Sequence, residues 1–401
     1  MALVPGTGRS GLVTRAWTHW GTSQHFETLR LPTHDAGTRL VGDVLGRALR
    51  GGDFVLDPFD AYGAGLVTNP NIIVAGSIGS GKSTLVKMMV DRALRRRRRV
   101  VVVDPKGEYG AIARAHGTSP LVIGRDGWCW PRLEGRGERD FVTTLLASAR
   151  GTALNDDELY VLDRAFATLA EPAPVRVLAA LYARLAPSLD DSSRAVERSL
   201  ALTLRRFIEG DLAGLYDGPG EPVGFDHGLV VIDVSQFWGT SALGVAALSA
   251  VAATEHLAAR PEPGYFIMDE AWTVLGDEAS LRWLQGSWKL ARSRGVSHVL
   301  VLHRWSDVAA AGAEGSSQRA RARGLLRECE IAWLFRQPPD EALEMAAILG
   351  LNAREERCLT DLPRGGALVR YGNARSLVQV RPRERDATFV DSDGAMRSAN
   401  A

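Results

Sequence analysis

Residues 71–84, NIIVAGSIGSGKST, join an apolar stretch to a glycine-rich run that ends in Lys82, Ser83 and Thr84. The spacing Gly-x-x-x-x-Gly-Lys-Ser is that of a P-loop, in which the backbone N–H groups of small residues turn towards phosphate oxygens. The lysine of such a loop reaches the outer phosphates of a nucleotide, and the serine hydroxyl ligates Mg²⁺. The sequence therefore predicts a site for ATP with Mg²⁺ as cofactor. The expected phosphate contacts come from Gly76, Ser77, Ile78, Gly79, Ser80, Gly81, Lys82, Ser83 and Thr84.

A carboxylate pair supplies what a P-loop lacks. Asp269 and Glu270 directly follow the apolar run at residues 265–268. An aspartate in this place can hold Mg²⁺ through its water shell, and the adjacent glutamate can orient or deprotonate the attacking water. We therefore predict Ser83 and Asp269 as metal ligands, with Lys82 and Glu270 as catalytic residues. His303 ends a later apolar run, where it serves either as a sensor of the γ-phosphate or as a structural residue.

These motifs contain no evident second cation for the charge that develops on the γ-phosphoryl group. An arginine supplied by a neighbouring subunit is a common remedy. Arg292 and Arg294, in the stretch LARSRGVSH, lie a short distance beyond Asp269 and Glu270, and Arg304 and Arg336 are alternatives. Because the chain is rich in arginine, Arg292 is equally well explained as a cation at a helix end.

The elements that position these residues read as an α/β core with a mainly parallel sheet. The run Val100–Val103 ends in the polar, turn-forming stretch DPKGEY, which places it at the carboxyl edge of a parallel sheet, where open α/β folds bind ligands. Residues 85–94 should form the helix after the P-loop. Further strands are expected at 229–234, 265–268, 299–302 and 331–335, and a hairpin at 368–371 and 376–380. Helices are expected at 242–258, around 281–288, near 325 and at 340–349.

Residues 140–219 differ in character and predict an all-helical insertion. Asn155 can cap a helix that places Leu159, Leu162, Phe166 and Leu169 on one face. Two more helices are expected at 175–185 and 194–208. The predicted organisation is a short N-terminal segment at 1–50, with one helix near 40–49, a core formed by 51–139 and 220–390, the insertion at 140–219, and a frayed tail at 391–401. Fraying is expected to begin at the charged residues from Arg381 onward.

Two further stretches allow two interpretations each. The aromatic residues of FVLDPFDAY, at 54–62, either wall a nucleotide base or pack under the sheet. The five consecutive arginines at 95–99 resemble a nucleic-acid patch, but cations at a helix C-terminus are also favoured by the helix dipole, and we favour that explanation.

Composition narrows the class of protein. The 401 residues carry a net charge of +1, so any contact with nucleic acid or an anionic membrane must be local. The three cysteines, Cys129, Cys329 and Cys358, match neither a disulfide framework nor a zinc site. The best candidate for a membrane span, residues 243–259, contains Glu255 and His256 and is better explained as a buried helix. A cytoplasmic protein, peripheral to the membrane only through partners, is the expectation.

Together these motifs resemble the HerA/FtsK group of hexameric P-loop motor ATPases. Within that group they look most like the energising ATPases of type IV secretion and conjugation, the TraC/TrbE kind. The matching stretches are GSIGSGKST, VVVVDPKGEY, FIMDEAW and FRQPPDEALEMAAILGL, together with the strand that leads into His303. The resemblance implies a RecA-like P-loop NTPase fold and favours Arg292 as the arginine acting in trans. Two features depart from the group, which usually has glutamine where His303 stands and a substantial N-terminal docking domain before residue 50.

Three functions follow from this reading. The first is Mg²⁺-dependent ATP hydrolysis by a homo-hexamer that powers a type IV secretion or conjugation apparatus, with a membrane channel and coupling proteins as partners. The second is a DNA-translocating motor, although the chain shows no evident DNA-reading module. The third is a nucleotide-binding assembly subunit without turnover, which the presence of Lys82, Ser83, Asp269 and Glu270 disfavours.

Overall fold

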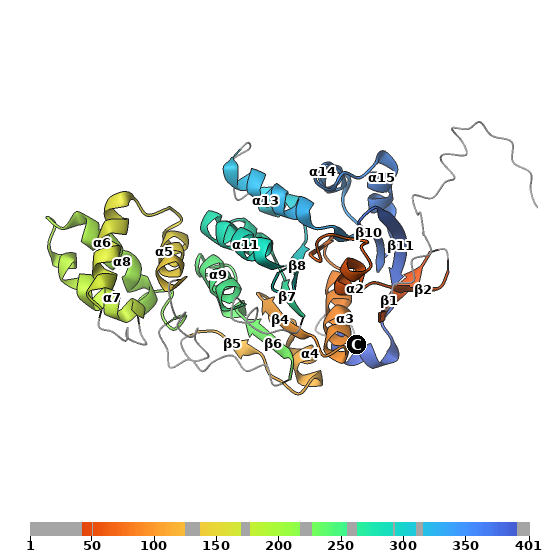
Figure 1. The fold of residues 1–401 in the computed structure, drawn as a ribbon, viewed down its shortest axis with the longest axis horizontal. Coiled ribbons are helices and arrows are strands. Elements are labelled where there is room, and N and C mark those ends of the chain that lie inside the picture. Colours follow the sequence, from red (N-terminus) through yellow and green to blue (C-terminus); the bar gives the residue numbers. More distant parts are fainter. Residues whose placement is uncertain are drawn as a thin grey trace, which may run out of the picture.

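The computed structural model describes residues 42–49, 51–124, 137–169, 177–216, 227–254, 263–291, 293–309 and 316–390. They form an 11-stranded sheet in the order β2-β1-β11-β10-β9-β3-β8-β7-β4-β6-β5 (Figure 1). The strands from β9 to β5 are parallel, and β10, β11, β1 and β2 add an antiparallel edge. The predicted α/β fold class is confirmed. The strands are β1 Val44–Ala48, β2 Asp53–Val55, β3 Ile72–Ala75, β4 Arg99–Asp104, β5 Leu121–Val122, β6 Leu229–Asp233, β7 Gly264–Met268, β8 Val296–Leu302, β9 Ile331–Phe335, β10 Gly366–Tyr371 and β11 Ala374–Val380.

The central strands are buried on both faces. All four residues of β3 are inaccessible to solvent, as expected for a strand in the middle of a parallel sheet. Alternate residues enter opposite halves of the core: Ile73 and Ala75 join one apolar cluster, and Ile72 and Val74 the other. The apolar runs that identified these strands in the sequence are therefore the layer between two sets of helices.

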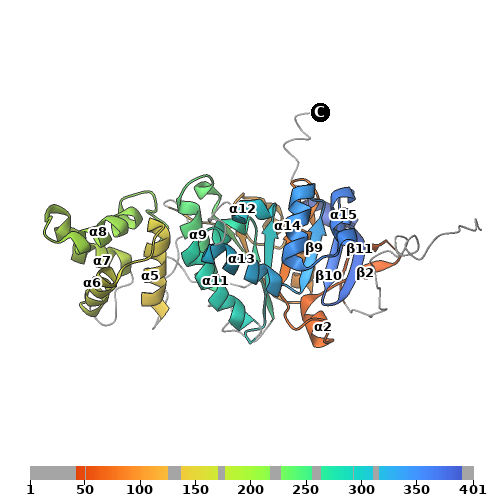
Figure 2. The same cartoon turned by 90° about the horizontal axis from the view of Figure 1, so that it is seen from above.

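One set of helices contains the helix that follows the P-loop. This set comprises α2 Pro58–Gly63, α3 Lys82–Arg95, α4 Gly110–Ala115 and α16 Ala387–Val390. The opposite set covers the other face, as Figure 2 shows for α9, α11, α13 and α14. It comprises α9 Ala242–Thr254, α10 Trp272–Leu275, α11 Glu278–Ala291, α12 Trp305–Ala309, α13 Ser317–Glu328, α14 Pro339–Leu349 and α15 Ala353–Asp361.

The region between residues 137 and 208 is largely helical in its described parts, as expected for the stretch after Asn155 and for 175–185 and 194–208, and its first helix was not predicted. It contains α5 Gly137–Arg150, α6 Asp156–Ala167, α7 Val177–Leu185, the 3₁₀ turn η1 Ala186–Asp190 and α8 Ala195–Ile208. Asn155 caps α6 in a reciprocal pair with Glu158. Leu162 is buried, but Leu159 is exposed, so the predicted apolar face of α6 is narrower than expected. Helix α5 packs against α9 and α11, while α6, α7 and α8 lie at the far end of the molecule from β1 and β2 (Figure 1).

The helix predicted near residues 40–49 is wrong. Residues 44–48 form β1, which pairs with β11 on one side and β2 on the other. Backbone hydrogen bonds to strands distant in sequence override the weak local helical pattern here. Of the aromatic residues at 54–62, Phe54 is buried in β2 and its ring meets Trp333 edge-on with centroids 5.5 Å apart, whereas Tyr62 is exposed. None of the described residues that line the cavity discussed below comes from this stretch.

The arginine run is a structural feature. Helix α3 ends at Arg95, and the side chains that follow form ion pairs with the carboxylates around α2. Arg96 contacts Asp60 at 2.6 Å, and Arg98 contacts Asp57. These pairs join the end of α3 to α2, so they support the interpretation that the run is not a nucleic-acid patch.

The tail predicted to fray from Arg381 is ordered up to Val390. The 3₁₀ turn η4 Glu384–Asp386 and helix α16 pack against α3 and α4. Asp386 is fully buried, and Phe389 is part of the core. One of the charges that suggested fraying, Asp386, is therefore neutralised by a partner far away in the sequence, Arg92. Residues 391–401 lie outside the described part.

Within the described residues, no helix is both long enough and apolar enough to cross a membrane. Residues 243–254 of the candidate span belong to α9, whose residues Leu243, Val245 and Leu248 are buried in the core, and residues 255–259 lie outside the described part. Cys329 is buried and Cys358 half-buried, both as free thiols, and Cys129 falls outside the described residues.

Candidate functional site

The loop between β3 and α3 has the shape that a phosphate cradle requires. Gly79 and Gly81 have φ angles of 72° and 114°, in the region that favours glycine. A Cβ at Gly76 would lie 2.5 Å from the Cβ of Phe335, so only glycine fits there. Neighbouring segments hold the loop, since the N–H of Ser77 donates to Arg336 O at 2.9 Å and the N–H of Gly365 donates to Ser80 O at 2.8 Å.

Lys82 is the first residue of α3, and its side chain is buried under the loop. Its ammonium donates to the carbonyls of Gly76 at 2.5 Å and Ser77 at 3.0 Å. The same nitrogen lies 2.8 Å from Nδ1 of His303. Burial lowers the pKa of Lys82 to about 8, against the opposing attraction of Asp269 and Glu270. A nucleotide phosphate must therefore displace these loop contacts in order to reach the ammonium.

Parallel strand register brings Asp269 and Glu270 to the same edge of the sheet as the P-loop. Strand β7 pairs with β4 and β8, and β8 pairs with β3, so the residues after these strands meet at one edge. Asp269 accepts a hydrogen bond from the Tyr109 hydroxyl at 3.0 Å. Burial, together with the neighbouring charge of Glu270, raises the pKa of Asp269. A bound cation would stabilise its ionised form.

Glu270 is held by three donors. Its backbone has a φ of 51°, unusual for a residue with a side chain. One carboxylate oxygen accepts the indole N–H of Trp272 at 2.7 Å. The other lies 2.5 Å from Nε2 of His303 and forms an ion pair with Lys106. Burial alone would raise the pKa of Glu270, but the contacts with His303 and Lys106 outweigh it and lower the pKa to about 2.

Lys106 is one of the site residues that the sequence interpretation missed. The carboxylate of Asp104, at the end of β4, accepts the N–H groups of Lys106, Glu108 and Tyr109 at 3.2, 3.1 and 2.8 Å. This turn directs the Lys106 side chain towards Glu270. Burial raises the pKa of Asp104 to about 6, although these N–H groups act in the opposite direction. The signal was present in the sequence, because Lys106 lies in the DPKGEY turn and is one of only four lysines.

These residues surround one cavity of about 450 Å³. Besides Lys106, Glu108 and Arg364, its lining includes predicted site residues and a group from the C-terminal segment. The predicted residues are Ile78, Gly79, Gly81, Lys82, Ser83, Thr84, Asp269, Glu270 and His303; the C-terminal residues are Pro382, Ala387 and Val390. The expectation that the site lacks a second cation is therefore wrong, since Lys106 and Arg364 both line it. Gly76, Ser77 and Ser80 shape the loop without lining the cavity.

The predicted arginines are placed differently. Arg292 lies outside the described residues. Arg304 and Arg336 are exposed, Arg294 is half-buried, and none of the three is among the described residues lining the cavity. The structure therefore leaves an arginine acting in trans as a prediction.

Ser83 and Asp269 could hold Mg²⁺ at this cavity. Among the described residues no cluster of three or more His, Cys, Asp or Glu side chains could bind a metal unaided. One hydroxyl and one carboxylate nevertheless suit Mg²⁺, which typically keeps several waters and binds through one or two carboxylates together with substrate phosphates. Both side chains line the cavity, and the buried Asp269 accepts hydrogen bonds from the Tyr109 hydroxyl and the Glu270 N–H. The donor set fits a metal that binds together with a nucleotide.

A family model described as the central domain of the helicase HerA matches residues 67–143. The match includes the P-loop, α3 and the DPKGEY turn. No curated protein matches the sequence significantly.

Solved structures share the fold over most of the chain. VirB4 of Thermoanaerobacter pseudethanolicus is 20% identical, with a TM-score of 0.74, over 86% of this chain and 98% of that one. The conjugative coupling protein TrwB, in its trigonal form with sulphate, is 16% identical, with a TM-score of 0.57, over 88% and 93%. TrwB in complex with ADP and Mg²⁺ is 17% identical, with a TM-score of 0.54, over 88% and 93%. The RecA-like P-loop NTPase fold and the resemblance to the HerA/FtsK group are confirmed.

Proposed function

We propose that the protein is an Mg²⁺-dependent ATPase that energises a type IV secretion or conjugation apparatus. The observation that carries the catalytic part is the convergence of Lys82, Ser83, Asp269 and Glu270 on one cavity at the carboxyl edge of a parallel sheet. The likeness to VirB4 and to a conjugative coupling protein supports the apparatus.

In this mechanism different residues of the cavity bind the nucleotide and activate the water. The P-loop N–H groups and Lys82 bind the phosphates, and Ser83 and Asp269 hold Mg²⁺, which neutralises phosphate charge. Glu270 orients the attacking water and accepts its proton. His303, between Lys82 and Glu270, links the phosphate-binding side to the base.

In this structure Lys106 pairs with Glu270, and Lys82 donates to the loop carbonyls. A carboxylate whose pKa is about 2 is a poor proton acceptor at neutral pH. A bound γ-phosphate would compete with Glu270 for Lys106 and with the loop carbonyls for Lys82. Once Lys106 moves to the phosphate, the pKa of Glu270 rises, and Lys106 stabilises the charge that develops in the transition state.

The variant Lys106→Gln tests this role. We expect kcat to fall roughly 10²- to 10³-fold, because a cation beside the reacting phosphoryl group is lost. Since Lys106 lowers the pKa of Glu270, its removal raises that pKa. The acidic limb of kcat/KM, which reports the free enzyme, should therefore move to higher pH. Steady-state rates between pH 4 and 9 measure the loss in kcat and show whether the acidic limb, which lies below this range in the wild type, enters it in the variant.

Lys289→Gln is the matched control, because Lys289 is an exposed lysine on α11 outside the cavity lining. It should keep the wild-type rate and profile. If Lys106→Gln behaved like this control, Lys106 would be only a surface charge near the site.

Two other functions remain as alternatives. The HerA family match favours a DNA-translocating motor, and a non-hydrolysing assembly subunit would use the same fold. ATP turnover by the purified chain, measured with and without single- and double-stranded DNA and alongside its mass in solution, separates them. We expect the chain to hydrolyse ATP and the rate to change by no more than about twofold when DNA is added. We also expect its mass in solution to be that of a hexameric ring. Strong stimulation by DNA would favour the motor, and binding of ATP without turnover the assembly subunit.

The apparatus itself needs a separate test. In the proposed function the ring acts at the cytoplasmic face of the membrane, where partner proteins of the channel hold it. The chain should therefore sediment with membranes when channel and coupling proteins are co-expressed, and not without them. Equal sedimentation in both cases would contradict docking through those partners.

A further inference from the structure

The C-terminal segment, residues 381–390, contributes to the lining of the cavity but is not part of any nucleotide-binding motif. It comprises residues 381–383, η4 and α16, and it lies against α3 and α4 in Figure 1. Three of its residues, Pro382, Ala387 and Val390, line the same cavity as Lys82 and Thr84. The segment is separated from the P-loop by about three quarters of the chain, so only the tertiary fold brings the two together.

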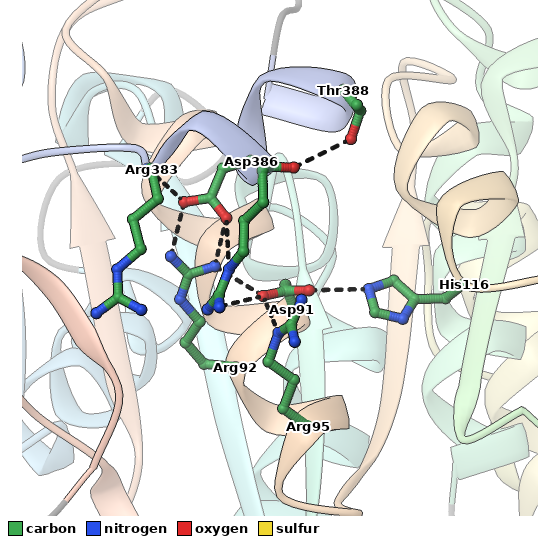
Figure 3. Close-up of polar contacts among 8 residues, drawn as sticks. Asp91, Arg92, Arg95, His116, Arg383, Asp386 and Thr388 are labelled. Atoms are coloured by element: carbon green, nitrogen blue, oxygen red, sulfur yellow. Dashed lines mark hydrogen bonds and ion pairs between the residues drawn. The ribbon is translucent and has the colours of Figure 1, made fainter.

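A buried ion pair fastens this segment to the P-loop helix. Asp386 is fully buried and binds Arg92 through two parallel contacts of 2.7 Å each (Figure 3). Bidentate contacts of this kind fix geometry as well as supplying energy. Asp386 also accepts the N–H of Arg383 at 2.7 Å. Because Arg92 belongs to α3, which begins with Lys82, the segment is held in register with the phosphate-binding loop.

Asp91 extends the attachment to α4. It contacts Arg92 and Arg95 on its own helix at 2.7 and 2.8 Å, and His116, directly after α4, at 3.2 Å (Figure 3). The side chain of Asp91 is 2% exposed. The carboxylate of Asp91 thus supports the Arg92–Asp386 pair. We call Arg92 and Asp386 together the clasp.

The residues of the segment differ in their burial. Asp386 and Phe389 are buried against the protein, whereas Pro382 and Ala387 are exposed and Val390 is half-buried. The three cavity residues of the segment are apolar, whereas the lining from the P-loop and the strand ends includes Lys82, Asp269 and Glu270. A ligand with a highly charged end and a flat, less polar end matches this distribution. A nucleoside triphosphate has that chemistry, with the phosphates at α3 and the base at the apolar side.

We propose that Pro382, Ala387 and Val390 form the wall against which the base of the nucleotide packs, and that the clasp positions this wall. The inference rests on the proposed function only in requiring that the P-loop bind the phosphates. It assigns the base contacts to a segment outside the nucleotide-binding motifs.

The test compares two ligands that share phosphates and differ in the base. Binding of MgATP and of magnesium tripolyphosphate to the full chain is measured by calorimetry for the wild type, Ala387→Asn, Val390→Asn and Asp386→Asn. Asparagine adds a polar group to the wall without adding charge that would repel phosphate. We expect each wall variant to lose roughly tenfold in ATP affinity, with tripolyphosphate affinity unchanged. Asp386→Asn should show the same selective loss, because it weakens the clasp.

Thr388→Asn is the matched control, since Thr388 is an exposed neighbour on α16 outside the described lining of the cavity. It should bind both ligands like the wild type. Wall variants that keep the wild-type ratio of ATP to tripolyphosphate affinity would overturn the wall, as would equal losses for both ligands or tighter ATP binding. If Asp386→Asn fails to fold, the wall variants still test the proposal, Ala387→Asn above all, because Ala387 is exposed. A wild type that binds neither ligand would instead overturn the proposed function.

Discussion

ATP hydrolysis is expected to fall below detection in Lys82→Ala, and ATP binding to weaken at least tenfold. Lys82 is the cation at the base of the P-loop, and its ammonium already lies within 3.0 Å of two loop carbonyls, ready to exchange them for phosphate oxygens. Losing a cation that contacts the transferred phosphoryl group costs about 10³- to 10⁵-fold in rate in comparable sites. Turnover in a phosphate-release assay and calorimetric affinity for MgATP measure the two effects.

Two controls separate the role in catalysis from a role in folding. The free energy of unfolding of nucleotide-free Lys82→Ala should not fall greatly, since removing a buried cation offsets the lost hydrogen bonds. Lys82→Arg should also be inactive, because a larger guanidinium replaces an ammonium that already has close partners on the loop and His303. Wild-type turnover by Lys82→Ala would remove the assignment of this loop as the catalytic phosphate site.

Lys82 also predicts a pH dependence of binding. In the nucleotide-free protein its pKa is lowered to about 8, and bound phosphates raise it again. Above pH 8 the Lys82 side chain is mainly a neutral amine, which must take up a proton to become the ammonium when ATP binds, so the affinity should fall as the pH rises. Lys82→Ala should lack this dependence, and calorimetry in buffers of different ionisation enthalpy detects the proton uptake.

The second large effect is expected in Glu270→Gln, which should bind MgATP at least as tightly as the wild type and hydrolyse it about 10³-fold more slowly. The amide has the same shape, so the hydrogen bond from Trp272 can persist. It cannot accept the proton of the attacking water, and general base catalysis is typically worth ~10²- to 10⁴-fold. Removing a negative charge beside the phosphates favours binding. Single-turnover hydrolysis and equilibrium binding separate the two parameters.

Glu108→Gln serves as the comparison, because it removes another carboxylate from the lining of the same cavity. Its rate should stay within a few-fold of the wild type, which would show that loss of negative charge is not the cause. Weakened nucleotide affinity with a normal rate in Glu270→Gln would make Glu270 a metal or structural residue.

The same variant tests the arginine predicted to act in trans. Arg292→Ala and Glu270→Gln should each be inactive alone. Mixed rings of the two should recover partial turnover, since a neighbour can supply an intact Arg292 to a site with an intact Glu270. Lys106 and Arg364 already line the cavity of one subunit, so normal turnover by Arg292→Ala would show that these cations suffice.

Local patterns in the sequence determined much of this protein. The strand at 331–335 and the hairpin after residue 366 were predicted closely, because buried parallel strands and tight turns have strong local signatures. The P-loop and the Asp269-Glu270 pair were found for the same reason: each motif is contiguous in the chain. That they face one cavity followed from a general property of parallel sheets, whose carboxyl ends lie at one edge.

Tertiary structure decided the features that depend on partners distant in the sequence. Residues 44–48 became a strand only because β11 and β2 offer hydrogen bonds. The charged residues after Arg381 are ordered because Arg92 neutralises Asp386 in the interior. Lys106 became a site residue through its ion pair with Glu270, 164 positions further along the chain. Periodicity and spacing report the conformational preferences of one stretch of sequence. Hydrogen-bond partners, buried charges and the wall of a cavity depend on two stretches that are distant in the sequence and meet only in the folded protein.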